Sequence, residues 1–176
     1  MKFGAREVVL PSLEPATVYV EKAGPEVLGQ MYTFPDKAGR PLCLRPEGTA
    51  TCQLLAWETF KNQRDVKLFY AATCWRYERP QAGRYREFLQ FGVEVLNPSL
   101  DWRDPLIELA SEMVSRWTND FTLARQAQRG LAYYLGDGFE LACESLGAQK
   151  QVCGGGTYTE GIGFAIGVDR LGLAAR

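Results

Sequence analysis

Histidine is absent from this chain, and its absence removes several kinds of chemistry at once. Serine or cysteine nucleophiles that depend on a histidine base cannot be assembled. A zinc site is disfavoured as well, because the five cysteines form no Cys-x-x-Cys pair and no imidazole can complete a ligand set. We therefore predict no metal site built from protein side chains.

A long apolar run and an excess of charge are also missing. Apolar residues make up 46% and charged residues 23%, as in ordinary globular proteins. The 20 basic and 21 acidic residues almost cancel, which disfavours a large nucleic-acid surface but leaves a local basic patch open. With no apolar leader or membrane segment, we expect a cytoplasmic protein with reduced thiols and no membrane contact.

Short strand-like runs joined by local turns, together with a few helical segments, predict one α+β domain, an antiparallel sheet with helices on one face. Residues 11–30, rich in proline and glycine, read as irregular. Strands are expected over 6–10, 31–34, 41–45, 66–71, 74–78, 88–96 and 161–167, with two more within 129–144 around Gly136-Asp137-Gly138. Helices are expected from a Thr49 or Thr51 cap to about Asn62, from Asp104 with Pro105 as first helical residue through Trp117, and at the C-terminus.

Residues 74–94 carry the strongest functional pattern. Two strand-like runs flank a Pro-Gln-Ala-Gly turn, with arginines at 76, 79, 84 and 86. Strand side chains alternate, so Leu89, Phe91, Val93 and Val95 are expected in the core, opposite Phe88, Gln90, Gly92 and Glu94. That second face is typical of the floor of a ligand-binding site, and the arginines favour binding of a polyanion such as ATP. The alternative is a half-exposed hairpin with solvated charges.

The run 161–167 repeats this asymmetry. Gly161, Gly163, Ala165 and Gly167 leave one face almost bare, which permits close approach of a ligand or of another backbone. Arg170 follows at the junction with a helix, where a guanidinium can reach a terminal phosphate. A packed glycine-rich strand followed by a surface arginine is the alternative. Gly154, Gly155 and Gly156 read as a turn that leads into this strand.

Four segments, in order along the chain, resemble the catalytic core of histidyl-tRNA synthetases, which are class II aminoacyl-tRNA synthetases. They are Leu-Arg-Pro-Glu-Gly-Thr-Ala at 44–50, Trp-Arg-Tyr-Glu-Arg-Pro-Gln-Ala-Gly-Arg-Tyr-Arg at 75–86, Arg-Gly-Leu-Ala-Tyr-Tyr at 129–134 and Gly-Phe-Ala-Ile-Gly-Val-Asp-Arg-Leu at 163–171. The resemblance implies a single minimal catalytic domain over residues 1–176, with an antiparallel sheet flanked by helices. It also implies ATP, bound with Mg²⁺, as the second substrate of amino-acid activation.

The resemblance assigns roles to individual residues. Three arginines would be catalytic. Arg76 and Arg129 would act at the α-phosphate, and Arg170 would act at the γ-phosphate. ATP would be bound by Arg76, Glu78, Arg84, Arg86, Phe88 and Arg170. The amino acid would be bound by Glu47, Thr49 and Gln90 at its ammonium and carboxylate, and by Glu94, Tyr134 and Tyr158 at its imidazole.

The chain also departs from the synthetases. Glu94 and Arg129 are only 35 residues apart, where the family has a long helical insertion. The main hypothesis is an enzyme that activates histidine or a similar amino acid for a tRNA or another carrier, with a homodimer as one arrangement. The alternative is a non-catalytic histidine-binding protein similar to the regulatory subunit of ATP phosphoribosyltransferase. A minimised or truncated catalytic core is a third reading that the sequence does not separate from the first.

Overall fold

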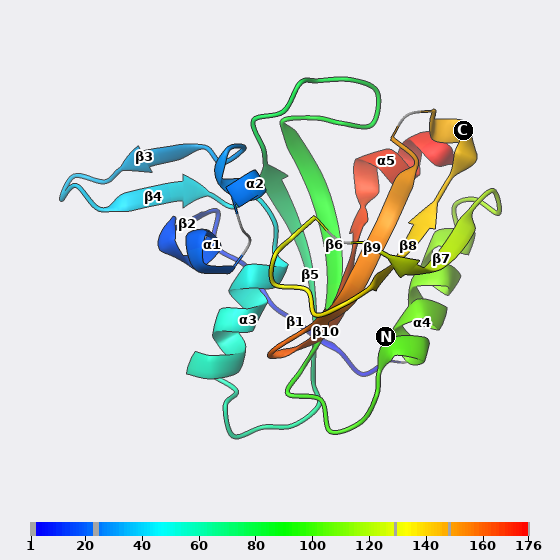
Figure 1. Cartoon of the computed structure of the whole chain (residues 1–176), viewed down its shortest axis with the longest axis horizontal. Helices are drawn as coiled ribbons and strands as arrows, with labels where there is room; N and C mark the ends of the chain where they lie inside the picture. Colours follow the sequence, from blue (N-terminus) through cyan, green and yellow to red (C-terminus); the bar gives the residue numbers. More distant parts are fainter. Residues whose placement is uncertain (1–2, 23–24, 129, 148, 176) are drawn as a thin grey trace.

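A seven-stranded sheet forms the centre of the computed structural model, which describes residues 3–22, 25–128, 130–147 and 149–175 (Figure 1). The strand order is β1-β5-β6-β10-β9-β8-β7. Neighbouring strands are antiparallel except for β1 and β5, which are parallel. The strands are β1 (Arg6–Glu7), β5 (Val66–Trp75), β6 (Glu87–Leu96), β7 (Thr122–Ala127), β8 (Gly138–Ala142), β9 (Gln151–Tyr158) and β10 (Gly161–Gly167).

A second, three-stranded sheet extends from the body, at the left of Figure 1. It consists of β2 (Leu13–Pro15), β4 (Pro41–Leu44) and β3 (Thr33–Pro35), and α1 (Thr17–Lys22) and α2 (Pro25–Leu28) lie beside it. The predicted strand pair 31–34 and 41–45 is confirmed by β3 and β4. The prediction that residues 11–30 are irregular is wrong, because tertiary contacts of residues such as Tyr19 order this segment.

Helices cover both faces of the large sheet, so the prediction of helices on one face is wrong. α3 (Thr49–Glu58) packs over β5 through Cys52 and Ala56, which lie in one cluster with Leu68 and Tyr70. The opposite face is covered by α4 (Arg103–Ser115) and α5 (Val168–Ala174), and a short 3₁₀ turn, η1, spans Glu144–Leu146. Within the described residues, no helix combines the length and apolar character needed to span a membrane.

Several strand boundaries differ from the predicted ones. The predicted strands 66–71 and 74–78 are one continuous strand, β5, which ends before Arg76. The three consecutive glycines lie inside β9 and not in a turn, because β8 and β10 pair with them on both sides. Two strands were expected within 129–144, and in the described part of that range, residues 130–144, only β8 forms. Its partner β7 lies earlier in the chain.

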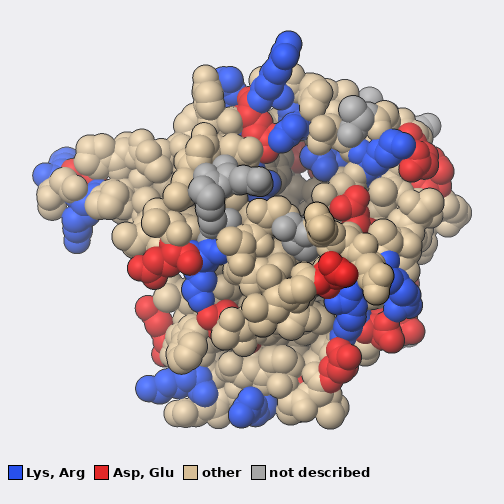
Figure 2. Space-filling model, in the orientation of Figure 1, with Lys and Arg blue, Asp and Glu red and all other residues tan. Residues whose placement is uncertain are grey.

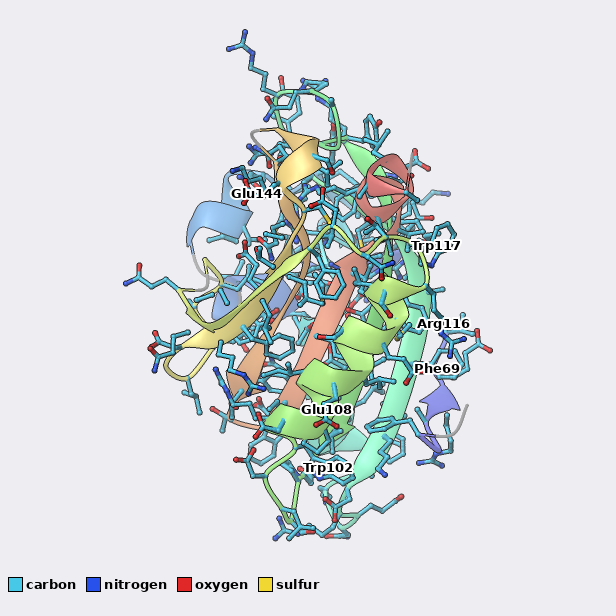
Figure 3. The ribbon with its side chains drawn as sticks, turned by 90° about the vertical axis from the view of Figure 1, so that its right-hand side faces the viewer. Phe69, Trp102, Glu108, Arg116, Trp117 and Glu144 are labelled. Carbon is cyan, nitrogen blue, oxygen red and sulfur yellow. The ribbon has the colours of Figure 1, made fainter. Side chains whose placement is uncertain are left out.

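The helix ends differ too. Gly48 precedes α3, so neither Thr49 nor Thr51 is its cap, and the helix stops at Glu58. α4 begins at Arg103, which places Pro105 inside its first turn. Its expected apolar stripe is buried except near its C-terminal end, where Trp117 lies beyond the helix and is 56% exposed (Figure 3).

Candidate functional site

A cavity of about 340 Å³ opens on the sheet face opposite α4 and α5. Lysine and arginine side chains gather around the hollow at the top of the molecule in Figure 2. The lining combines β6, β9 and β10 with the loop before α3, the loop between β5 and β6, and the segment after β7. Of the predicted site residues it includes Glu47, Thr49, Arg76, Glu78, Arg84, Phe88, Gln90, Tyr134 and Arg170.

The floor of the cavity follows the predicted alternation. Phe88 and Gln90 of β6 face the cavity, whereas Val93 and Val95 lie in the opposite core. Gly154, Ala165 and Gly167 contribute the nearly bare part of the floor. Leu89 was expected in the core but is 38% exposed. It lies beside the polar start of α5, where the Asp169 carboxylate accepts the backbone N–H of Leu89 at 2.6 Å.

Three arginines converge on one wall. Arg76 donates from Nε to the carbonyl oxygen of Pro46 at 2.9 Å, and its guanidinium lies 5.4 Å from the centre of the Phe88 ring. Arg84 forms an ion pair with Glu78. Arg170 donates from Nε to the carbonyl of Gly83 at 2.8 Å and from Nη1 to the carbonyl of Gln151 at 2.6 Å. Side chains from β6, from the loop before it and from α5 thus meet at one point.

The electrostatics of this wall favour an anionic ligand. Burial lowers the pKa of Arg170 below its usual range, and the neighbouring charges of Arg84 and Arg76 lower it further. Glu140 opposes this shift. Cations that lie this close together gain most from a bound polyanion, which relieves their mutual repulsion.

Glu47 organises the opposite wall. Its carboxylate accepts the backbone N–H of Thr49 at 2.7 Å and of Ala50 at 2.9 Å, and it also accepts the Tyr133 hydroxyl at 3.2 Å. It therefore satisfies the first amides of α3, the role that the sequence suggested for a threonine. Burial raises the pKa of Glu47 despite these hydrogen bonds.

Gln90 is held by a residue that sequence reasoning missed. Its Oε1 accepts the N–H of Gly48 at 3.0 Å and the hydroxyl of Tyr70 at 3.1 Å. Tyr70 is fully buried, and a Cβ at Gly48 or Gly92 would overlap its ring. Tyr70 lies on the same face of β5 as the buried apolar residues Leu68 and Ala72, so nothing in the local pattern distinguishes it from them.

Glu94 lies behind the cavity and not in its lining. Its two carboxylate oxygens accept the Thr49 hydroxyl at 2.7 Å and the Tyr158 hydroxyl at 2.8 Å. Glu94 and Tyr158 are both buried. Burial raises the pKa of Glu94 to about 8, although both hydrogen bonds lower it. Two of the three residues predicted to contact an imidazole, Glu94 and Tyr158, are therefore paired with each other behind the cavity, whereas the third, Tyr134, lines it.

One predicted ATP-binding residue of the described chain, Arg86, does not line the cavity. Arg86 is exposed, donates from Nε to the Glu78 carbonyl at 3.0 Å and stacks 4.3 Å above the centre of the Tyr77 ring. It is absent from the cavity lining. Arg129 lies outside the described residues.

The raised pKa of Glu94 predicts a pH dependence of stability. The folded chain retains a proton that the unfolded chain releases above its ordinary pKa of 4.5. This contribution is complete below pH 4.5 and is lost as the pH rises toward 8. We expect the free energy of unfolding to fall between pH 5 and 8, by at most about 1.4 kcal/mol per pH unit from this group.

Urea unfolding at several pH values measures that slope. Glu94→Gln should flatten it, because the amide does not titrate. Some slope should remain, since burial also raises the pKa of Glu47 and Glu14. Identical slopes for the two proteins would show that Glu94 is ionised in the folded chain at neutral pH.

The family model for histidyl-tRNA synthetase matches residues 1–121. The histidine–tRNA ligase of Archaeoglobus fulgidus is 32% identical over 276 aligned positions, which cover 96% of this chain and 68% of that protein. That alignment is longer than the 176 residues of this chain, so about a hundred or more positions are occupied by the relative alone.

Two solved structures share the fold. Apo histidyl-tRNA synthetase from S. aureus superimposes with a TM-score of 0.79 at 24% identity, over 98% of this chain and 61% of that one. A protein from Bacillus halodurans C, described as an ATP phosphoribosyltransferase regulatory subunit/histidyl-tRNA synthetase, gives a TM-score of 0.82 at 18% identity. The superposition covers 99% of this chain and 76% of the Bacillus halodurans chain. These likenesses show the class II synthetase fold.

Proposed function

This chain belongs to the histidyl-tRNA synthetase family, and from that premise we propose that its cavity activates histidine with ATP to form histidyl-adenylate. The observation that carries the proposal is the convergence of Arg76, Arg84 and Arg170 on one wall of the cavity. Three cations facing one space suit a triphosphate, and guanidinium groups bind phosphate oxygens with two donors at once.

The reaction needs electrostatics more than a protein nucleophile. An oxygen of the amino-acid carboxylate attacks the α-phosphorus of ATP, the bond to the β-phosphate breaks, and pyrophosphate leaves. No proton has to be transferred in this step, so the absence of histidine is no obstacle. Arg76 stabilises the charge that develops at the α-phosphate, and Arg170 holds the terminal phosphate. Mg²⁺ enters with ATP.

The amino acid occupies the end of the cavity beside α3. Glu47 supplies a carboxylate for the ammonium group, and Thr49 and Gln90 supply polar contacts close by. Tyr134 lines the same end, and the buried pair Glu94 and Tyr158 lies directly behind Thr49. We assign the imidazole to this group, since carboxylate and hydroxyl side chains match its two ring nitrogens. By the family resemblance Arg129 acts at the α-phosphate as well.

Histidine-dependent exchange of labelled pyrophosphate into ATP tests the proposal. The chain should catalyse exchange with histidine and not with the other standard amino acids. Exchange without amino-acid preference would refute the assignment of the imidazole pocket. Absence of exchange from a folded, ATP-binding chain would refute activation itself. We further propose that the activated histidine is passed to an acceptor, a tRNA or another carrier. We also propose that the chain assembles as a homodimer.

The likeness to the Bacillus halodurans protein supports a second candidate, a histidine-binding regulatory chain. Arg170 donates to two backbone carbonyls, as a purely structural arginine would. Isothermal titration separates the two functions. Histidine binding without ATP binding or exchange favours the regulatory role, whereas histidine binding together with exchange favours the enzyme.

A further inference from the structure

A buried carboxylate in the turn between β9 and β10 has no part in the proposed reaction. Glu160 is 7% exposed and follows Tyr158 by two positions. Its Oε1 accepts hydrogen bonds from Nζ of Lys22 at 2.5 Å and from Nε1 of Trp57 at 2.8 Å. Because these donors come from α1 and α3, one carboxylate joins three segments that are distant in the sequence.

Each of the three segments leads to the amino-acid end of the cavity. α3 starts at Thr49, which lines the cavity and donates to Glu94. β9 ends at Tyr158, which donates to the other oxygen of Glu94. α1 carries Tyr19, whose hydroxyl donates to the carbonyl of Glu47 at 3.3 Å. The position of these segments therefore sets the positions of the groups that meet the amino acid.

The ion pair within this cluster is partly shielded from solvent, although Trp57 is 61% exposed. The Lys22 side chain is 26% exposed and that of Glu160 only 6%, so solvent and salt screen the ion pair less than an exposed pair. Burial alone would raise the pKa of Glu160, but the hydrogen bonds from Lys22 and Trp57 outweigh it and leave the pKa lowered. Removing Lys22 leaves a buried, ionised carboxylate without its cation, which is costly.

We infer that Glu160, with Lys22 and Trp57, is a positioning residue that assembles the amino-acid end of the site. The inference rests on the proposed activation of an amino acid. It concerns the affinity for the amino acid and not for ATP, because the phosphate wall is built from the loop between β5 and β6 and from α5. A site that is assembled only part of the time binds its ligand more weakly, in proportion to the assembled fraction.

Steady-state pyrophosphate exchange with Glu160→Gln and Lys22→Met tests the inference. We expect the KM for histidine to rise about tenfold, the effect of losing one charge-assisted hydrogen bond. The KM for ATP should stay within about twofold of the original value. Lys22→Arg, which keeps the cation, should restore the KM for histidine. Because KM does not depend on the amount of active protein, partial unfolding of a variant would not produce this difference between the two substrates.

The matched control is Glu112→Gln, which breaks an exposed ion pair between α4 and Arg116, the residue that follows it, on the other side of the sheet (Figure 3). It should leave both KM values unchanged. If the cluster variants raise both KM values equally, or neither, the inference is overturned while the proposed function stands.

If the unaltered chain shows no exchange, the proposed function fails instead, and deuterium uptake then decides the inference. Backbone amides of α1 and of the turn between β9 and β10 should exchange faster in Glu160→Gln than in Glu112→Gln. Equal uptake in the two variants would overturn it.

Discussion

Replacing Arg76 with alanine is expected to lower kcat for histidine-dependent pyrophosphate exchange by about 10²–10³, while the chain stays folded. The charge that the reaction creates develops at the α-phosphate, and in the proposed function Arg76 lies there. An interaction that strengthens only in the transition state reduces kcat when it is lost. Stability should change little, because Arg76 itself lines the cavity, so water can take its place as the donor to the Pro46 carbonyl.

Two comparison variants make this result specific. Arg76→Lys keeps the charge but loses the planar pair of donors, so it should recover only part of the rate. Arg116→Ala removes an exposed arginine directly after α4 and should leave the rate unchanged. An Arg76→Ala protein that retains more than about a tenth of the original kcat would show that the α-phosphate is stabilised elsewhere.

Gly163→Ala is expected to destabilise the chain by about 2–3 kcal/mol, the cost of forcing a methyl group into a packed interior. A Cβ at this position would lie 2.5 Å from Cδ of Glu94 and 2.7 Å from the backbone carbonyl oxygen of Val93. The backbone oxygen belongs to the paired strand β6, so it has little freedom to move. Displacing Glu94 should also weaken its hydrogen bonds with Thr49 and Tyr158, and with them histidine binding.

Gly172→Ala in α5 is the matched control, since a Cβ there meets no atom within 4 Å. It should leave stability unchanged or raise it by up to about 1 kcal/mol, because alanine favours helix more than glycine. Chemical denaturation of both variants gives the comparison. Equal stabilities would mean that the sheet can shift to admit a methyl group at Gly163.

The part of the site that follows strand alternation could be predicted from the sequence. Phe88 and Gln90 on one strand, and the bare face of Gly161, Gly163, Ala165 and Gly167 on another, identified the two central strands of the floor. This succeeded because a period of two fixes the face of each residue once one face is known to be core.

The failures arose where partners distant in the sequence decide the structure. Gly154, Gly155 and Gly156 look like a turn, but pairing with β8 and β10 makes them a strand. The hydrogen bond from Trp57 to Glu160 spans 103 residues, and the one from Lys22 spans 138. No local pattern signals such pairs, and the same holds for Tyr70 beneath Gln90.

The central place of β10 has a consequence for how the chain is made. β10 pairs with β6 on one side and β9 on the other, and its Gly163 pairs with Glu94, about 70 residues earlier. On the ribosome, β5 and β6 therefore emerge with an open strand edge that stays unpaired for roughly 4–14 s at the usual rate of synthesis. Throughout that interval the nascent chain exposes an aggregation-prone edge, and the floor of the cavity cannot be completed until β10 has been translated.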